Sequence, residues 1–418
     1  MKIKSLNIKN FKSIVDITID EPNPFTVFVG PNGSGKSNIF EALEFSNYFF
    51  ENGFDLINNH SKNLPNFEFD EIFSRKNNSD QISVLMEFNN SLSFNIISRI
   101  NEKVINEAEG IELFFKNRKS FLIDFFQKAF PEEREIHSGF DNLDNKIKLL
   151  SKTNLLKNDL LTTSFLFPKF EDKENNRIAS FAENRNFSIE NIFEIIKLLE
   201  ESKALKVDEK NYTQFFGLFS RIFINGIVRD KRSYTRFLKS NASNLEKVLS
   251  RVISIEDKKE DFFDWLRLFI PEFKEIKFDK DKISGKNNFN IYENQSEHPF
   301  SKKLISDGTY NIFTLLTAVY QSDEPQFLCI EEPENGLHPF VIRKMVDFFR
   351  QACEDKGHYI WLNTHSQTLV ECLTADEVIV VDKAEGETKV TQLKGTNLHG
   401  LDMAEYWLSG ATGSGTPW

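Results

Sequence analysis

The segment from Gly30 to Ser37 constrains the fold of this chain more than any other. It reads Gly-Pro-Asn-Gly-Ser-Gly-Lys-Ser and follows an apolar, β-branched run at residues 26–29, which is typical of a buried parallel strand. A helix is expected to begin near Lys36. A strand, a loop of the pattern G-x-x-x-x-G-K-[ST] and a helix, in this order, form a phosphate-binding loop. The alternative is an ordinary glycine-rich turn, and the motifs further along the chain argue against it.

Each part of this loop has an expected role. Its glycines let backbone N–H groups wrap around phosphates without clashes from Cβ atoms, and the following helix adds the positive end of its dipole. Lys36 is expected to reach the β- and γ-phosphates of ATP, and Ser37 to offer its hydroxyl to Mg²⁺. ATP and Mg²⁺ are therefore the expected cofactors. The candidate nucleotide-binding residues of the loop are Asn32, Gly33, Ser34, Gly35, Lys36, Ser37 and Asn38.

An apolar run at residues 327–330 ends in two acidic residues, Glu331 and Glu332. An apolar strand with this ending is the Walker B pattern. Glu331 is expected to hold Mg²⁺ through water, and Glu332 to polarise the attacking water as a general base. Most proteins with this pattern carry aspartate at the first position, and glutamate is one methylene longer. The alternative is a solvated acidic turn.

Residues 304–309, Leu-Ile-Ser-Asp-Gly-Thr, resemble the ABC signature, which opens a helix aimed at the γ-phosphate of the opposite subunit. Ser306 and the amides around Gly308 would bind phosphate oxygens. Asp307 stands where the signature has glycine, and a carboxylate there would repel phosphate unless it points away. The alternative is a simple helix N-cap, because Ser and Asp are preferred capping residues.

A strand that ends in Thr364, His365 and Ser366 resembles the switch-histidine segment of the same proteins. A neutral His365 would contact the γ-phosphate or orient the attacking water. The alternative is a loop histidine with ordinary hydrogen-bond partners. His338 lies where the D-loop should be, a loop that crosses the dimer interface in the family, and we interpret it as structural.

Together with the opening residues 6–13, Leu-Asn-Ile-Lys-Asn-Phe-Lys-Ser, these motifs resemble the RecF/structural-maintenance-of-chromosomes (SMC) branch of ABC ATPases. More closely, they resemble the small AAA-type ATPases related to overcoming-lysogenisation-defect (OLD) proteins. The resemblance covers residues 1–50 and 300–395. It implies that Lys12 lies near the nucleotide phosphates. It also implies a homodimer, or a higher oligomer, in which each phosphate-binding loop faces the signature helix of the other head.

The order of the elements predicts an α/β fold. Strands alternate with helices after residue 300, which indicates a mostly parallel sheet. A P-loop NTPase head of the ABC type is thus expected, split in sequence by a large, mainly helical insertion. The expected parts are an N-terminal part of the head at 1–50, one or two inserted lobes at 51–300, a C-terminal part of the head at 301–395 and a tail at 396–418.

Composition limits the classes of partner and compartment. The net charge of −11 argues against a protein that coats DNA along its whole surface. The basic segment 229–239 carries interleaved aromatic residues and is either a solvated helix face or a local contact for nucleic acid. The cysteines form no C-x-x-C pair and fit reduced thiols in the cytoplasm. No stretch approaches about 18 consecutive apolar residues, so no membrane span is expected.

These observations predict an ATPase in which closure of the two heads changes the activity of another molecule. The resemblance implies a separately encoded effector, a nuclease or toxin, in bacterial anti-phage defence. About 50 residues follow His365, too few for the Toprim domain of an OLD nuclease, so the effector is expected to act in trans. Two alternatives stay open: a RecF-like DNA-repair ATPase, and a nucleotide-gated scaffold without hydrolysis, which Glu331 and Asp307 permit. The amphipathic segment 401–408 would either dock a partner or close its own fold.

Overall fold

The computed structural model of the chain describes residues 2–58, 81–88, 92–99, 110–116, 160–166, 218–223, 236–280, 287–296, 298–301 and 304–410. These residues fall into two compact units, each built on a sheet of its own. The first unit contains Met1–Pro22, Glu41–Gly217 and Glu385–Thr388; the second contains Asn23–Phe40, Leu218–Ala384 and Lys389–Trp418. The second unit therefore holds both the phosphate-binding loop and the Walker B motif.

The first unit is built on an antiparallel sheet with the strand order β2-β1-β4-β5-β6-β7. On β1, Leu6 and Ile8 are buried, whereas Lys9 is exposed, as expected where one face of a strand is covered. The ring of Phe11 packs against that of Phe45 in α1 (Lys36–Asn58), with 5.7 Å between centroids. The strands are β1 (Ile3–Phe11), β2 (Ile14–Asp20), β4 (Gln81–Phe88), β5 (Leu92–Arg99), β6 (Gly110–Lys116) and β7 (Leu160–Leu166).

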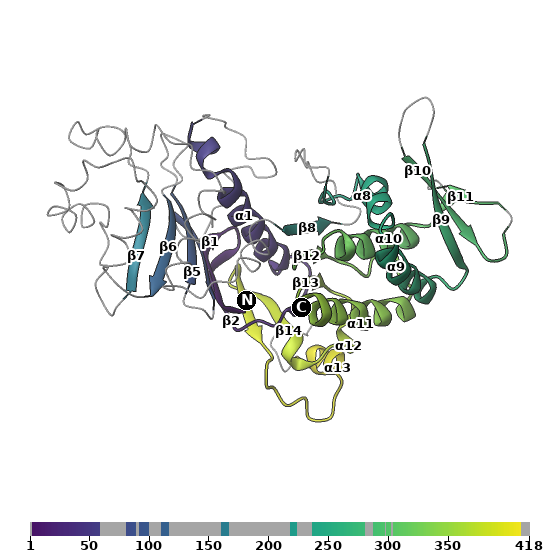
Figure 1. Cartoon of the computed structure of the whole chain (residues 1–418). Helices are drawn as coiled ribbons and strands as arrows, with labels where there is room; N and C mark the ends of the chain where they lie inside the picture. The colour runs from purple at the N-terminus through teal and green to yellow at the C-terminus, as the bar shows by residue number, and fades with distance from the viewer. Residues whose placement is uncertain are drawn as a thin grey trace. The chain divides into compact units, whose positions relative to one another are not determined.

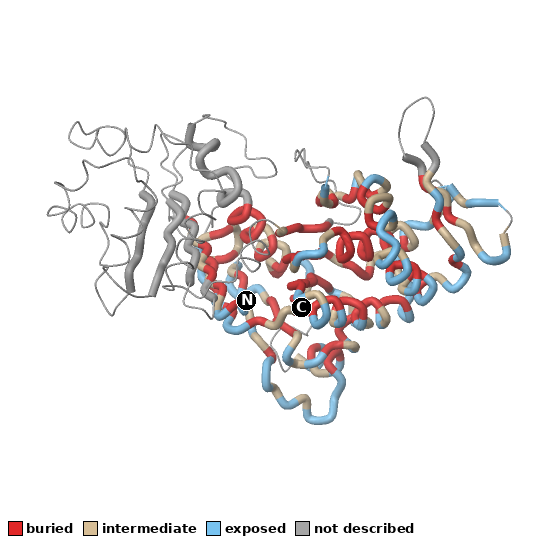
Figure 2. The backbone as a smooth tube through the Cα atoms, in the orientation of Figure 1, coloured by how far each residue is buried: buried red, intermediate tan, exposed pale blue. Residues whose placement is uncertain are grey.

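The second unit is built on a sheet in which β14, β3, β13, β12 and β8 pair in parallel, in that order, with β15 beyond β14. Strands β3, β12 and β13 are buried along their whole length, as Figure 2 shows. Because the carboxyl ends of parallel strands meet at one edge, the loops that follow these strands lie together. The strands are β3 (Phe25–Val29), β8 (Phe219–Phe223), β12 (Phe327–Glu331), β13 (Tyr359–Thr364), β14 (Val378–Ala384) and β15 (Glu387–Gln392).

Helices share one apolar core with this sheet. Helix α11 contacts β3 and β13, and α10 contacts α8 and α9 (Figure 1). Helix α11 ends before Gly357, whose left-handed φ of 67° suits a glycine C-cap. The helices are α8 (Leu245–Val252), α9 (Glu256–Phe269), α10 (Asp307–Tyr320), α11 (Pro339–Lys356), α12 (Gln367–Glu371) and α13 (Met403–Leu408). A small antiparallel sheet consists of β9 (Phe273–Lys280), β10 (Asn287–Glu293) and β11 (Phe300–Ser301).

The predicted α/β head with a mostly parallel sheet is confirmed, and the two helices predicted near Lys36 and at the signature-like segment begin at Lys36 and Asp307. The predicted bounds of the inserted lobes, 51–300, stay a prediction. Residues from Leu218 onward belong to the second unit, because β8 pairs with β12 and the apolar faces of α8 and α9 enter the same core. Most of residues 51–300 lie outside the described residues; the described part contains β4–β7 besides α8 and α9.

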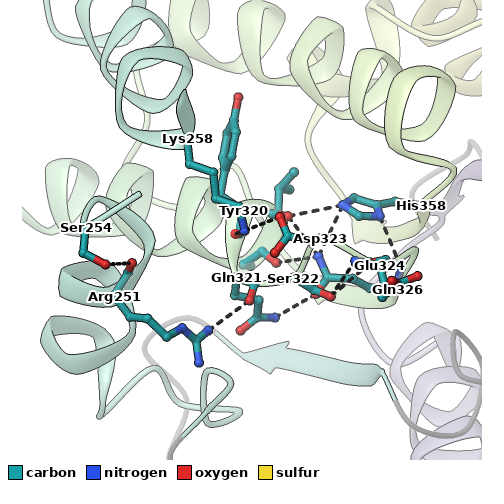
Figure 3. A network of polar contacts seen from close by, with 12 residues as sticks. Arg251, Ser254, Lys258, Tyr320, Gln321, Ser322, Asp323, Glu324, Gln326 and His358 are labelled. Atoms are coloured by element: carbon teal, nitrogen blue, oxygen red, sulfur yellow. Dashed lines mark hydrogen bonds and ion pairs between the residues drawn. The ribbon is translucent and has the colours of Figure 1, made fainter. Parts of the chain in front are cut away.

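A buried polar network ties the carboxyl end of α10 to the starts of β12 and β13 (Figure 3). The Gln326 amide donates to the carbonyl oxygens of Ala318 and Val319 at 3.1 and 2.9 Å, and its oxygen accepts from Gln321 at 3.1 Å. The ring of His358 accepts a hydrogen bond from the backbone N–H of Gln326 at 3.2 Å. Burial lowers the pKa of His358 to about 4. The network therefore contains a neutral histidine at neutral pH and fixes α10 against the sheet.

Candidate nucleotide-binding site

The phosphate-binding loop follows β3 and folds around the side chain of Lys36. The Lys36 ammonium donates to the carbonyl oxygens of Gly30 and Pro31 at 2.8 and 2.9 Å. Burial lowers the pKa of Lys36, and the negative charges of nearby Glu332, Glu331 and Glu334 oppose this effect. A Cβ atom on Gly30 would lie 2.0 Å from the carbonyl oxygen of Val381, so only glycine fits there. The loop thus holds a buried cation against its own carbonyl oxygens at the end of β3.

The remaining loop residues take positions that suit phosphate binding. Asn32 and Gly33 are exposed at the tip, and Gly33 adopts a left-handed φ of 77°. Ser34 is buried beneath them. The N–H of Asn38 donates to the carbonyl oxygen of Gly35 at 3.1 Å in the first turn of α1. The structure therefore places the predicted nucleotide-binding residues of this loop in one turn, and their contacts with a nucleotide stay predictions.

The two predicted metal ligands meet at the end of β12. The hydroxyl of Ser37 donates to Oε2 of Glu331 at 2.8 Å. The side-chain amide of Asn363, at the end of β13, donates both to that oxygen and to the Ser37 hydroxyl, the latter at 3.0 Å. Asn363 is buried, and the sequence analysis did not select it. The sequence feature that could have identified Asn363 is its position directly before Thr364 and His365. The end of β13 pairs in register with the end of β12, so this position lies beside Glu331.

A second residue that the sequence analysis missed is Arg221 on β8. Its Nε and Nη2 donate to Oε1 of Glu331 at 3.0 and 2.6 Å. The side chains of Arg221 and Glu331 are only 10% and 3% exposed, so this ion pair is buried. The available signal was an arginine inside the apolar run Phe-Ser-Arg-Ile-Phe, since an arginine within a buried strand needs a carboxylate partner.

The two predicted catalytic residues, Glu332 and His365, also lie side by side. One carboxylate oxygen of Glu332 is 3.4 Å from Nδ1 of His365, and the two side chains are 41% and 44% exposed. The other carboxylate oxygen accepts from the side-chain amide of Asn335 at 2.9 Å. Glu332 has a left-handed φ of 47°, and its N–H donates to the carbonyl oxygen of Asn363 at 2.8 Å. Such a backbone conformation is uncommon for glutamate and clusters at functional sites.

A third carboxylate, Glu334, lies behind this pair. It is buried and accepts a hydrogen bond from the hydroxyl of Thr364. The same hydroxyl accepts from the N–H of Ser366 at 2.9 Å, which fixes the chain on either side of His365. Burial raises the pKa of Glu334, and the hydrogen bond from Thr364 opposes this effect. Glu334 therefore supports the segment that carries His365 and is less suited than the more exposed Glu332 to accept a proton from water.

These donors fit a magnesium–nucleotide complex. Mg²⁺ prefers oxygen ligands, usually keeps several waters, and is commonly held by one or two protein groups together with phosphates. Ser37 and Glu331 present a hydroxyl and a carboxylate of this kind. Within the described ranges, no cluster of three or more His, Cys, Asp or Glu side chains is placed to hold a metal ion. A Mg²⁺ ion held by Ser37 and Glu331 would take phosphate oxygens and water as its other ligands.

The segment that resembles the ABC signature begins α10. The hydroxyl of Ser306 accepts from the N–H of Thr309 at 3.1 Å, so Ser306 is the N-cap, as the alternative interpretation of this segment predicts. Ser306 and Asp307 are exposed. A Cβ atom on Gly308 would lie 2.2 Å from the carbonyl oxygen of Gly336, so packing explains the glycine. The binding of phosphate by Ser306 and Gly308 stays a prediction.

The other residues named from the sequence have simpler roles in the structure. Lys12 lies in the first unit, where its ammonium pairs with Glu41, and its role near phosphate stays a prediction. His338 caps α11 by accepting from the N–H of Phe340 at 3.2 Å, which suits its structural interpretation. Trp407 is buried in the core, so α13 closes its own fold there. In the basic segment 229–239, residues 229–235 lie outside the described residues, and Arg236 stacks over the ring of Phe237.

Comparison with protein families gives a match over most of the chain. A model described as "AAA domain, putative AbiEii toxin, Type IV TA system" matches residues 25–371. The chain belongs to this family. This AAA-family chain is 22% identical over 406 residues to an ATP/GTP phosphatase of Helicobacter pylori, a match that covers 94% of this chain and 92% of that protein.

Two other relatives are much longer proteins. The chain is 24% identical over 293 residues to the chromosome partition protein Smc of Methanocaldococcus jannaschii, covering 66% of this chain and 23% of Smc. It is 24% identical over 273 residues to the DNA double-strand break repair Rad50 ATPase of Methanococcus maripaludis, covering 51% and 27%. The chain thus spans about a quarter of the Smc and Rad50 relatives that it matches.

Among solved structures, the Smc head bound to the C-winged helix domain of ScpA aligns with a TM-score of 0.46 and 16% identity, over 94% of this chain and 98% of that one. The family match and the relatives identify this AAA-family chain as an ATPase of the RecF/SMC-like branch. Among its described helices, none combines the length and the apolar character that a membrane crossing requires.

Proposed function

We propose that this chain binds ATP and Mg²⁺ at the Gly30–Ser37 loop and hydrolyses ATP when two heads close on each other. The observation that carries this proposal is the meeting of two residue pairs at one edge of the sheet. Ser37 bonds to Glu331 at 2.8 Å, and Glu332 lies 3.4 Å from His365. The first pair suits a metal ion and the second suits a water molecule that attacks the γ-phosphate.

In this mechanism the residues of the chain have separate tasks. Lys36 exchanges its bonds to the loop carbonyls for bonds to the β- and γ-phosphates. Ser37 and Glu331 would hold Mg²⁺, and the ion would supply positive charge that offsets the negative charge of the phosphates. Glu332 accepts a proton from the attacking water, and His365 orients that water. The Glu332 side chain is 41% exposed and can therefore reach water.

Closure of two heads is supported by the amino end of α10. Ser306 and Asp307 are exposed there, so this end of the helix is accessible to a nucleotide held by a second copy. Two large apolar side chains are exposed as well: Leu304 just before α10 is 70% exposed, and Phe340 at the start of α11 is 50% exposed. Exposed apolar side chains next to a polar binding end suit a surface that is buried only when a partner is present.

We further propose that closure controls a separately encoded effector, a nuclease or toxin, in bacterial anti-phage defence. The description of the family, which names a toxin and a toxin–antitoxin system, supports this proposal. ATP hydrolysis alone has no further effect in the cell, so another molecule has to bind or respond to the closed state. A RecF-like role in DNA repair and a scaffold without hydrolysis are the outcomes that the experiments below distinguish from it.

The hydrolysis step is tested with Glu332→Gln, which removes the base and keeps its size. We expect ATP binding to persist and hydrolysis to slow by at least about 100-fold, the usual lower range for a general base. With ATP, the variant should accumulate as a dimer in light scattering, whereas Lys36→Ala should not respond to ATP. Normal turnover by Glu332→Gln would exclude Glu332 as the base.

The effector is tested by expressing the chain together with the genes that neighbour it. We expect co-purification of an effector and ATP-dependent nuclease activity or growth arrest that Lys36→Ala abolishes. A chain that purifies alone, hydrolyses ATP faster on addition of duplex DNA and causes no arrest would favour the repair role. A chain that closes on ATP without measurable turnover would favour the scaffold.

A further inference from the structure

A chain of side-chain contacts runs from the amino end of α10 to the candidate base. It begins at Asn311, which is fully buried on α10, in the second turn of the helix. The Asn311 amide donates to the carbonyl oxygens of Pro333 and Asn335 at 3.0 and 2.8 Å. Both acceptors belong to the turn Pro333–Leu337, which follows Glu332 directly. One side chain thus binds α10 to the turn after the Walker B strand.

Backbone packing strengthens the same contact. The Cβ that Gly308 lacks would lie 2.2 Å from the carbonyl oxygen of Gly336, so the first turn of α10 touches the Pro333–Leu337 turn without a side chain between them. Gly336 itself has a left-handed φ of 74°. Because these backbone atoms are already in contact, there is no space in which one can move without moving the other, and close-packed protein interiors transmit strain. A displacement of the amino end of α10 must therefore displace the turn.

The Pro333–Leu337 turn also fixes the position of Glu332. The side-chain amide of Asn335 donates to a carboxylate oxygen of Glu332 at 2.9 Å, and the N–H of Asn335 donates to the Glu332 carbonyl oxygen at 3.2 Å. Glu332 has a left-handed φ of 47°, a conformation that glutamate adopts only where its surroundings enforce it. The orientation of the Glu332 carboxylate toward His365 consequently depends on the position of the turn.

The carboxyl end of α10 is anchored as well. The network in Figure 3 joins Gln321, at the C-cap of α10, to Gln326 and His358 at the starts of β12 and β13. Helix α10 is thus bonded near both ends to residues that flank β12, the strand that ends in Glu331. A contact at its exposed amino end can be passed to Glu332 through α10 and the turn.

We propose that Asn311 and Asn335 are positioning residues that couple the amino end of α10 to Glu332 of the same head. The inference rests on the proposed function, in which Glu332 is the base and α10 meets the nucleotide of a second copy. A nucleotide bound by one head then adjusts the base of the other head when the two close. The two sites hydrolyse ATP cooperatively, because nucleotide bound to one head changes the position of Glu332 in the other head through this chain of contacts.

The test compares Asn311→Ala and Asn335→Ala with Thr314→Ala in the full-length chain. Thr314 is a matched control: it is fully buried on the same helix, and its hydroxyl donates to the Tyr310 carbonyl oxygen at 3.0 Å, within α10. We measure affinity for a fluorescent ATP analogue, kcat, KM, the Hill coefficient of hydrolysis and the unfolding midpoint. Asn335 is half-buried, so Asn335→Ala provides a folded variant even where Asn311→Ala is unstable.

We expect both asparagine variants to bind the analogue as the wild type does and to lose kcat by at least about tenfold, since small misplacements of a catalytic group cost rate rather than binding. Their Hill coefficient should fall to one. Thr314→Ala should lose stability and keep both kcat and cooperativity. In a Glu332→Gln background, Asn335→Ala should add no further loss, because both changes then act on the same group.

Three outcomes separate this inference from the proposed function. If Glu332→Gln abolishes hydrolysis while both asparagine variants behave like Thr314→Ala, the coupling is absent and the base assignment stands. If Asn335→Ala lowers kcat equally in the wild type and in the Glu332→Gln background, Asn335 does not act through Glu332, and the inference is overturned. If Glu332→Gln hydrolyses ATP normally, the proposed function itself fails, and so does the inference built on it.

Discussion

Arg221 donates two hydrogen bonds to a single carboxylate oxygen of Glu331, from Nε at 3.0 Å and from Nη2 at 2.6 Å. The other oxygen of the same carboxylate accepts from Ser37 at 2.8 Å. The Glu331 carboxylate therefore links Arg221 on β8 to Ser37 at the start of α1. An aspartate is one methylene shorter, so this double contact accounts for glutamate at the first Walker B position.

Replacing Arg221 by methionine should destabilise the fold strongly, because the carboxylate of Glu331 would stay buried without its cation. Breaking a buried ion pair from one side costs about 3–5 kcal/mol of unfolding free energy. The double variant Arg221→Met/Glu331→Gln should recover most of this loss, and Arg267→Met, at an exposed pair with Asp264, should change little. Urea unfolding measures all three. Equal losses in the single and double variants would mean that Arg221 stabilises β8 by packing alone.

Lys36→Ala should abolish measurable ATP binding. The change removes the cation that the loop folds around, whose ammonium is held by Gly30 and Pro31 and lies where phosphates are expected. Lys344→Ala, which removes a partly exposed lysine on α11, is the control and should bind ATP normally. Titration calorimetry with ATP and Mg²⁺ provides the measurement. If Lys36→Ala binds ATP as well as the control does, the loop is not the phosphate site.

The sequence predicted the parts of the site that lie in continuous motifs. Glu331 ends a buried strand, and the loop at Gly30–Ser37, Glu332 and His365 each follow one. Parallel pairing brings these strand ends to one edge of the sheet. Local sequence carries this information, because an apolar run and the residue after it are neighbours in the chain. The pairing of β3 with β13 and of β13 with β12 does the rest.

The residues that the sequence did not predict form contacts across long separations. Arg221 meets Glu331 from 110 residues away, and Asn311 meets Asn335 from 24 residues away. An arginine within Phe-Ser-Arg-Ile-Phe has no motif, and its partner depends on β8 pairing with β12. The same pairing places residues from Leu218 onward in the second unit. Such assignments depend on tertiary pairing, which no local pattern specifies.

Glu334→Gln should leave hydrolysis within about threefold of the wild type, in contrast to the loss of about 100-fold expected for Glu332→Gln. Glutamine keeps the shape of Glu334 and can still accept the hydrogen bond from Thr364. Burial raises the pKa of Glu334, so its ionisation costs stability as pH rises from the unfolded pKa of 4.5 through the folded value. The glutamine variant should therefore be more stable than the wild type at pH 8 and gain less at pH 5. The exposed Glu354→Gln should show no such difference in urea midpoints, and a loss of activity in Glu334→Gln would reassign the base.

His358 should make the stability of the head depend on pH in the acid range. The ring is fully buried and accepts a hydrogen bond from the N–H of Gln326, and burial lowers its pKa from 6.5 to about 4. Between these two values the unfolded chain binds a proton that the folded chain does not. Stability is therefore complete above pH 6.5 and falls as pH decreases toward 4, by about 3 kcal/mol for a difference of this size.

His358→Asn should remove most of this dependence, because an asparagine oxygen can replace Nδ1 as the acceptor for Gln326 and does not titrate. We expect the urea midpoint of the wild type to fall between pH 7 and pH 5, and that of His358→Asn to fall much less. His399→Asn is the matched control, since His399 is exposed and asparagine tolerates its left-handed φ of 53°. If His358→Asn loses stability with falling pH as steeply as the control does, His358 does not cause the acid sensitivity. Carboxylates outside the network in Figure 3 then cause it.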